Sequence, residues 1–278
     1  MEKVVQFGVR GHLVGIVTIL DKHPGNTLKP AILFLNAGLQ HRVGPYRLHV
    51  DLCRALAAKG YLAFRFDLSG IGDSQFTPET LGYQERNIND IRSAMDFMEQ
   101  RYNCTTFVLV GLCSGASNAH MTAVADERII GLVLMDGFVF RTLGFYRRVI
   151  VKYLNDPKRF FKTLINIIAS RFKRMLNVPG EQVRRPSMFA NVAPSQEQLS
   201  YEFNALVQRG VAMLVVYTGT VRSYYNYAGQ FIDMFPRVDF KDKLYLEYFY
   251  DADHTFTSIG ERKKLTTAIL RWINDLYG

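Results

Sequence analysis

The sequence has too few cysteines for a disulfide framework and lacks the clusters that bind structural metals. Its 278 residues include three cysteines, Cys53, Cys104 and Cys113, a number too small and too odd for a disulfide-stabilised fold. No CxxC pair and no His/Cys cluster at metal-ligand spacing occurs, so we expect neither a metal nor a cofactor. The cysteine usage favours a reduced, cytoplasmic protein.

Long apolar runs are also missing. No run approaches the roughly 20 residues that span a bilayer. The first residues, MEKVVQFGVRG, lack the charged-then-apolar order of a secretory signal. Apolar residues nevertheless make up 48% and charged residues 21%, which is typical of a globular domain and excludes wholesale disorder, collagen and coiled coil.

Acidic residues are scarce in one stretch of the chain. Residues 141–185 contain twelve basic residues against two acidic ones, a formal charge of +10. The whole chain carries +9, so the remainder is close to neutral at −1. No recognised nucleic-acid-binding motif accompanies this charge, so we expect no nucleic-acid partner.

Apolar runs typical of strands alternate with helical spacing along most of the chain, which predicts a mostly parallel sheet with helices on both faces. The pattern predicts eight strands, at 4–9, 14–20, 31–35, 62–66, 107–110, 129–135, 211–217 and 244–249. It predicts helices at 46–59, 85–101, 114–125, 224–234 and 261–276. Removing residues 138–208 leaves the alternation regular. We therefore predict an α/β core from 1–137 and 209–278, with 138–208 as a helical, basic cap insertion.

The string Gly111-Leu112-Cys113-Ser114-Gly115 fits the nucleophile elbow, G-x-Nuc-x-G, with cysteine where serine usually stands. Small residues are needed two positions before and after a nucleophile in such a strained turn. The helix that follows points its N-terminal amides at the thiol, where they favour a thiolate and a developing oxyanion. A buried structural cysteine in a glycine-rich turn is the alternative interpretation.

A base and an acid complete the hypothesis. His254 directly follows the last predicted strand, in Ala252-Asp253-His254-Thr255-Phe256, and could exchange a proton with Cys113. In this arrangement the acid usually follows the strand at 211–217, where Thr218-Gly219-Thr220-Val221 has no carboxylate. Asp136, after the preceding strand, keeps the order nucleophile, acid, base. Asp233, Asp239 or a Cys–His dyad without an acid remain alternatives.

The oxyanion hole needs two amides. We expect the Ser114 N–H to be one and the Gly38 or Leu39 N–H, in the loop after the strand at 31–35, to be the other. Gln40, His41 and Arg42 would then line the mouth of the site.

Together these residues resemble the α/β-hydrolase fold. The strings Asn36-Ala37-Gly38-Leu39-Gln40-His41-Arg42, Gly70-Ile71-Gly72-Asp73-Ser74, Gly111-Leu112-Cys113 and Ala252-Asp253-His254-Thr255-Phe256 are also similar to the exosortase A system-associated hydrolases. That resemblance implies an acyl-ester or thioester hydrolase with a cysteine nucleophile. The family usually has an aspartate where Val221 stands and none where Asp136 stands, so this chain departs from it at the acid.

The basic stretch contains two predicted amphipathic helices, at 146–154 and 160–172, separated by Asn155-Asp156-Pro157. As a cap, its apolar face would line an acyl pocket and its basic face would meet solvent. A solvated face without a partner is the plain interpretation. The alternative is attraction of an anionic acyl carrier or substrate, or peripheral contact of residues 141–185 with a membrane.

Two functions follow from the sequence. The first is a cysteine-dependent enzyme that cleaves or transfers an acyl group through a Cys113 thioester. The second, motivated by Val221 at the usual acid position, is a non-catalytic ligand-binding or acyl-binding protein on a degenerate hydrolase scaffold.

Overall fold

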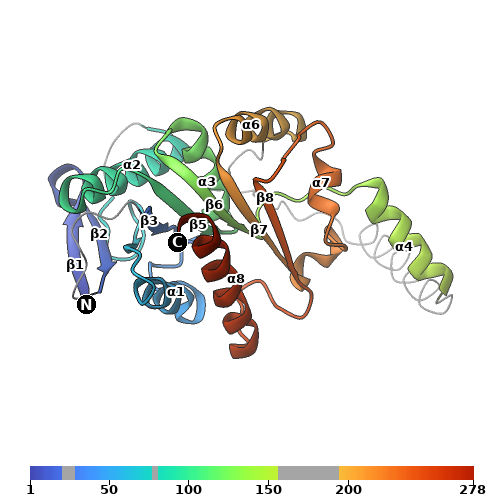
Figure 1. The fold of residues 1–278 in the computed structure, drawn as a ribbon, viewed down its shortest axis with the longest axis horizontal. Helices are drawn as coiled ribbons and strands as arrows, with labels where there is room; N and C mark the ends of the chain where they lie inside the picture. The colour runs from blue at the N-terminus through green and yellow to red at the C-terminus, as the bar shows by residue number, and fades with distance from the viewer. Residues whose placement is uncertain (21–28, 77–80, 156–193) are drawn as a thin grey trace, which may run out of the picture.

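A computed structural model of the chain describes residues 1–20, 29–76, 81–155 and 194–278. A sheet of eight strands runs through it in the order β1-β2-β4-β3-β5-β6-β7-β8 (Figure 1). The β1–β2 and β2–β4 pairs are antiparallel, and the other neighbours are parallel. The strands are β1 (Glu2–Phe7), β2 (Leu13–Thr18), β3 (Ala31–Phe34), β4 (Ala63–Phe66), β5 (Phe107–Leu112), β6 (Ile129–Met135), β7 (Ala212–Thr218) and β8 (Leu244–Phe249). The predicted mostly parallel, eight-stranded sheet is confirmed.

Helices cover both faces of this sheet. One face carries α1 (Leu48–Ala57) and α8 (Ile259–Tyr277), and the other carries α2 (Tyr83–Tyr102), α3 (Ser114–Ala125) and α6 (Gln196–Gln208) (Figure 1). Short 3₁₀ turns lie at Val9–Gly11, Pro45–Arg47 and Gly219–Ser223. None of the helices in the described ranges is long and apolar enough to cross a membrane.

The strand residues divide between two hydrophobic cores because successive side chains of a strand point to opposite faces. In β3, Leu33 faces the α2–α3–α6 side, whereas Ile32 and Phe34 face the α1–α8 side. Both faces are fully buried, which explains why this strand is a continuous apolar run without polar alternation. The sheet is thereby fixed between two layers, and its strand ends are held in place.

The predicted helix at 224–234 is wrong over its first half. A helix forms only at α7 (Gln230–Met234), after the 3₁₀ turn at Gly219–Ser223. The Gln230 side chain accepts a hydrogen bond from the Asn226 N–H at 2.9 Å and donates one to the Tyr224 carbonyl at 2.6 Å. These bonds satisfy the backbone of 224–226 as a loop, so the segment does not need a helical turn there.

The region predicted as an insertion contains two described helices with different surroundings. α6 packs onto the core through Leu199, Phe203 and Leu206, all fully buried, and is the crossover between β6 and β7. α4 (Leu143–Asn155), which includes the predicted helix at 146–154, extends away from the sheet (Figure 1). The second predicted helix, at 160–172, lies outside the described residues.

Candidate active site

Cys113 stands at the sharp turn between β5 and α3. Its backbone adopts φ 57° and ψ −115°, a strained conformation for a residue with a side chain, and the thiol is exposed. A Cβ at Gly111 would lie 2.2 Å from the Gly115 carbonyl, and one at Gly115 would lie 2.7 Å from the Asn36 carbonyl oxygen. Both positions therefore require glycine, and the small residues of the predicted elbow have a steric reason.

Backbone hydrogen bonds align the ends of β5, β6 and β7. The Cys113 N–H donates to the Met135 carbonyl at 2.9 Å, and the Asp136 N–H donates to the Val216 carbonyl at 2.9 Å. Cys113 thus lies beside the end of β6, and Asp136 lies beside the end of β7. The carboxyl ends of parallel strands are where open α/β sheets place ligands.

The structure brings His254 and Asp136 into direct contact. His254 Nδ1 lies 2.8 Å from Asp136 Oδ2, although the two residues are 118 positions apart. The Asp136 side chain is completely buried, and that of His254 is 36% exposed. His254 therefore has one ring nitrogen on a buried carboxylate and the other available to the thiol.

Asp233 and Asp239, the other carboxylates considered, have different partners. The Tyr227 hydroxyl donates to Asp233 Oδ2, and Asp239 Oδ1 accepts from the Lys241 N–H at 3.2 Å. Neither is bonded to His254, so Asp136 is the carboxylate that the fold gives to this histidine.

Two threonines that were not among the candidates complete this contact. The Thr218 N–H and hydroxyl donate to Asp136 at 2.8 Å and 2.6 Å. The Thr220 hydroxyl accepts from the His254 N–H at 2.8 Å. Thr218 ends β7 and Thr220 follows it, where the sequence lacked the expected acid. The missing carboxylate was therefore itself a signal, because the Thr218 hydroxyl stands there as a partner for the acid that follows β6, and the Thr220 hydroxyl as a partner for the histidine loop.

Gly219, between these threonines, allows the His254 loop to approach. A Cβ at Gly219 would lie 1.9 Å from the Tyr250 carbonyl oxygen. The Gly219 N–H also donates to the Ala252 carbonyl at 3.0 Å. The loop that carries His254 is thus held against the end of β7 by backbone contact.

The electrostatics of the site favour a thiolate beside an imidazolium. Hydrogen bonding to His254 is the main cause that lowers the pKa of the Cys113 thiol, with the Ser114 amide adding to it and burial opposing it. Hydrogen bonds to Asp136 and then to Cys113 raise the pKa of His254 from 6.5 to about 10. Each charged form therefore stabilises the other.

The loop after β3 lies against the elbow, as the oxyanion hypothesis requires. Gly38 adopts φ 57°, and its N–H donates to Ser114 Oγ at 2.7 Å. The Gly38 amide therefore lies next to the Ser114 side chain, one residue after Cys113. The Leu39 side chain is 65% exposed and leaves this loop open to solvent.

Asp67, which was not among the candidates, holds that loop in shape. Its fully buried carboxylate accepts from the Asn36 side chain at 3.1 Å and from the Arg42 N–H at 2.5 Å. The Arg42 guanidinium also pairs with Asp67 and, at 2.5 Å, with Asp73. Arg42, expected at the mouth of the site, braces the loop that carries Gly38 through these pairings.

Within the described residues, no three His, Cys, Asp or Glu side chains converge in a way that could hold a metal ion. The chemistry that this site can perform with its own groups is nucleophilic attack by a thiolate, proton transfer by an imidazole, and stabilisation of an oxyanion by amides.

Comparisons with known proteins agree with this architecture. A sequence model of the alpha/beta hydrolase fold family matches residues 30–190, more than half of the chain. No curated protein sequence matches significantly.

Solved structures with the same fold include an esterase from Pyrococcus furiosus, 14% identical with a TM-score of 0.61, covering 100% of this chain and 91% of that chain. An alpha-beta serine hydrolase homologue from Coxiella burnetii is 14% identical, with a TM-score of 0.57 and coverage of 98% and 96%. The thioesterase domain from the curacin biosynthetic pathway is 16% identical, with a TM-score of 0.57 and coverage of 97% and 99%. At these identities the likeness establishes the fold alone. With the family match, it shows that this chain belongs to the alpha/beta hydrolase fold family.

Proposed function

We propose that this protein is a cysteine-dependent hydrolase that cleaves an ester or thioester through an acyl intermediate on Cys113. The observation that carries the proposal is the 2.8 Å contact of His254 Nδ1 with the buried Asp136 carboxylate, next to a thiol at the elbow. The esterase and the thioesterase domain among the structural neighbours add support for the class of substrate.

In the first half of the reaction, Cys113 Sγ attacks the substrate carbonyl carbon and its electron pair forms a C–S bond. The carbonyl oxygen becomes an oxyanion, which the Ser114 N–H and the Gly38 N–H would stabilise. The Gly38 N–H currently donates to Ser114 Oγ, so it must exchange that acceptor for the oxyanion. Collapse of the intermediate breaks the bond to the leaving oxygen or sulfur, which takes a proton from the His254 imidazolium.

In the second half, neutral His254 takes a proton from water as the water oxygen attacks the Cys113 thioester. Collapse releases the carboxylic acid and returns the thiolate–imidazolium pair. An alcohol, amine or thiol in place of water would give acyl transfer by the same steps, because a thioester reacts with each of these nucleophiles. Asp136 keeps the His254 ring oriented with Nε2 toward the thiol throughout.

The non-catalytic alternative rested on the missing carboxylate after β7. Asp136 supplies a carboxylate from β6, and Thr218 bonds to it from β7, so the geometry favours the enzyme.

Replacing the thiol tests the proposal. Cys113→Ala should abolish release of p-nitrophenol from p-nitrophenyl butyrate and of thiol from butyryl-coenzyme A, because no other group there can form the acyl intermediate. Cys104→Ala is the matched control, since Cys104 is buried away from the elbow. Intact-mass analysis of the unmodified protein should detect a butyryl adduct that Cys113→Ala lacks. Unchanged turnover in Cys113→Ala would refute the proposal.

We further propose that this protein is similar in function to the exosortase A system-associated hydrolases. This proposal rests on the cysteine elbow and on the string Ala252-Asp253-His254-Thr255-Phe256. An acid on β6 in place of the family's aspartate at Val221 separates this chain from that pattern. We propose that the acid has moved between neighbouring strand ends and that the same chemistry is retained.

A second candidate role is peripheral attachment to an anionic membrane. α4 exposes an apolar stripe at helical spacing, with Leu143 90% and Leu154 73% exposed. Arg147 and Lys152 are also exposed on this helix, which has no acidic residue. Such a stripe on a helix with basic but no acidic residues suits insertion at the headgroup level of an anionic bilayer. The stripe consists of Leu143, Tyr146, Ile150 and Leu154.

Co-sedimentation with vesicles separates this role from a merely solvated helix. The protein should bind phosphatidylserine-containing vesicles, bind neutral phosphatidylcholine vesicles less, and lose binding at high salt because charges are screened. Leu154→Asp should weaken binding, whereas Tyr201→Asp, at a residue 78% exposed on α6, should not. Equal binding to both vesicle types would exclude the electrostatic part of the mechanism.

A further inference from the structure

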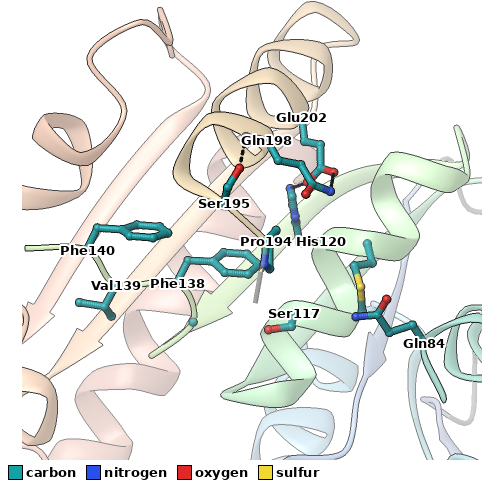
Figure 2. Close-up of a pocket in the computed structure, with 12 residues that line it drawn as sticks. Gln84, Ser117, His120, Phe138, Val139, Phe140, Pro194, Ser195, Gln198 and Glu202 are labelled. Atoms are coloured by element: carbon teal, nitrogen blue, oxygen red, sulfur yellow. Dashed lines mark hydrogen bonds and ion pairs between the residues drawn. The ribbon is translucent and has the colours of Figure 1, made fainter. Parts of the chain in front are cut away.

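A cavity of about 660 Å³ lies between α3, α6 and the residues that follow β6 (Figure 2). Ser117 on α3 and Gly137 after β6 line it. Ser117 is one turn after Cys113 on the same helix, with its N–H 3.3 Å from the Cys113 carbonyl, and Gly137 directly follows Asp136. The proposed catalytic groups themselves do not line the cavity, but Ser117 and Gly137 place one side of it near the end of β6 and the start of α3, where those groups lie.

The wall on the β6 side is apolar, and the end at α6 is polar. Phe138, Val139 and Phe140 line the first, whereas His120, Gln198 and Glu202 gather at the second (Figure 2). Gln198 Nε2 donates to Glu202 Oε1 at 2.9 Å, so the carboxylate is fixed in place. The apolar residues thus form one wall of the cavity, and the hydrogen-bonding groups of His120, Gln198 and Glu202 lie together where α6 closes it.

His120 is the unusual member of this cluster. It is completely buried, and its ring centroid lies 4.8 Å from that of Phe203. Within the described residues, neither of its ring nitrogens has a hydrogen-bond partner. Its Nε2 lies 3.5 Å from Glu202 Oε2, an ion-pair distance that falls short of hydrogen-bond geometry. Burial lowers the pKa of His120 to about 4, so its ring is neutral at pH 7 and offers one donor and one acceptor.

Leaving such a buried group unpaired destabilises the folded protein. A polar side chain retained under that penalty beside a cavity is suited to pair with a ligand. We propose that this cavity holds the acyl chain of the substrate and that His120 with Glu202 recognises a hydroxyl group on that chain. The inference rests on the proposed function for its orientation, because Cys113 marks the end at which the acyl carbon sits.

The chemistry of the cluster favours a hydroxyl over other polar groups. A hydroxyl can donate a hydrogen bond to Glu202 or to the unprotonated nitrogen of His120. It can also accept one from the protonated nitrogen, so it pairs with both the donor and the acceptor of the cluster. A carboxylate would face the negative charge of Glu202. An ammonium could pair with Glu202, but it would have to lose its water beside the apolar wall and would leave the His120 donor unpaired.

Competition among acyl chains tests this selectivity. The substrates are N-acetylcysteamine thioesters of hexanoic, 3-hydroxyhexanoic, 6-hydroxyhexanoic and 6-aminohexanoic acids and the monothioester of adipic acid. One of the hydroxy chains should exceed the hexanoyl chain about tenfold in kcat/KM, the size expected for pairing a buried polar group. A preference for the plain, amino or carboxy chain would overturn the proposal.

Two histidine variants separate recognition from stability. His120→Leu should bring the ratio of hydroxy to plain chain near one. His49→Leu, the matched control, should keep the ratio, because His49 is equally buried and unpaired but packs beside Phe34 on the α1 side of the sheet. Glu202→Gln, which keeps the shape, should reduce the ratio partly. An unchanged ratio in His120→Leu, with thermal unfolding showing a folded protein, would contradict the assignment.

A binding measurement distinguishes failure of this inference from failure of the proposed function. Calorimetric titration of Cys113→Ala with hexanamide and with 3- and 6-hydroxyhexanamide reports selectivity without turnover. Tighter binding of a hydroxy amide that His120→Leu removes supports the pocket even where turnover proves independent of Cys113. Equal binding of all three amides, with turnover still dependent on Cys113, leaves the enzyme and overturns the hydroxyl site.

Discussion

Cys113 and Cys53 show how two regions of one fold give the same side chain opposite chemistry. Cys53 lies within α1 and is completely buried in the core between α1, α8 and the sheet. Burial raises the pKa of the Cys53 thiol far above its usual range. Cys113 lies at the first turn of a helix, exposed, beside a histidine that lowers the pKa of its thiol. The difference in thiol pKa therefore follows from the placement of each cysteine, since the residue type is shared.

The largest expected effect is on alkylation of these two thiols. Iodoacetamide at pH 7 should modify Cys113 at least about 10³-fold faster than Cys53, because each unit of pKa changes the thiolate fraction tenfold and Cys53 is also inaccessible. Peptide mass analysis after timed quenching gives both rates in one sample. Comparable rates in the folded protein would remove the contrast on which the proposed mechanism depends.

The next effect concerns the carboxylate behind His254. Asp136→Asn should reduce kcat/KM for p-nitrophenyl butyrate about 10²- to 10³-fold, because an amide no longer fixes the imidazole in the required tautomer. The amide oxygen that this substitution introduces can still accept from the Thr218 N–H, so the fold should survive. Asp233→Asn is the control and should stay within about twofold, since Asp233 bonds to Tyr227 away from the thiol. Equal losses in both variants would take Asp136 out of the mechanism.

The catalytic groups in these two predictions differ in how far the sequence alone could identify them. The sequence could predict the elbow because backbone contacts of one local turn require Gly111 and Gly115. His254 was readable from its place after the last strand. The position of Asp136 followed only from chain order, and its partner Thr218 was missed, because a hydrogen bond between neighbouring strand ends depends on sheet order.

Other features depended on side chains that no periodic pattern encodes. Gln230 bonds to the backbone around 224–226 and turns a predicted helix into a loop. α6 has helical spacing through Leu199, Phe203 and Leu206, yet its sequence does not reveal that it packs on the core next to α3. The cavity and the unpaired His120 arise from that packing, so they could be found only in three dimensions.

The pH dependence should show both partners of the ion pair. Activity needs Cys113 deprotonated, so kcat/KM should rise with a midpoint below the ordinary thiol value of about 8.5. It also needs His254 protonated, so kcat/KM should fall near the raised pKa of about 10. In Asp136→Asn the falling limb should move to lower pH by about one to three units, because the partner that most raises the pKa of His254 is gone. A falling limb that stays in place would show that another group titrates there.

The smallest effect is expected from Thr218, which acts through Asp136 and does not meet the substrate. Thr218→Val keeps the side-chain shape and removes only the 2.6 Å hydrogen bond to Asp136 Oδ2. A lost hydrogen bond to a buried carboxylate is worth about 1.5 kcal/mol, so kcat should fall about tenfold with little change in KM.

A positioning role for Thr218 predicts more than lower activity. Without the Thr218 hydroxyl, Asp136 Oδ2 keeps only its contact with His254. The carboxylate then stabilises the imidazolium more strongly, which raises the pKa of His254. The falling limb of the pH profile should therefore move to higher pH. Thr122→Val is the matched control, because Thr122 is also completely buried and donates only to the Asn118 carbonyl within α3. It should destabilise the fold without moving either limb. If both variants lower thermal stability alike and leave the pH profile alone, Thr218 supports the fold and does not position the acid.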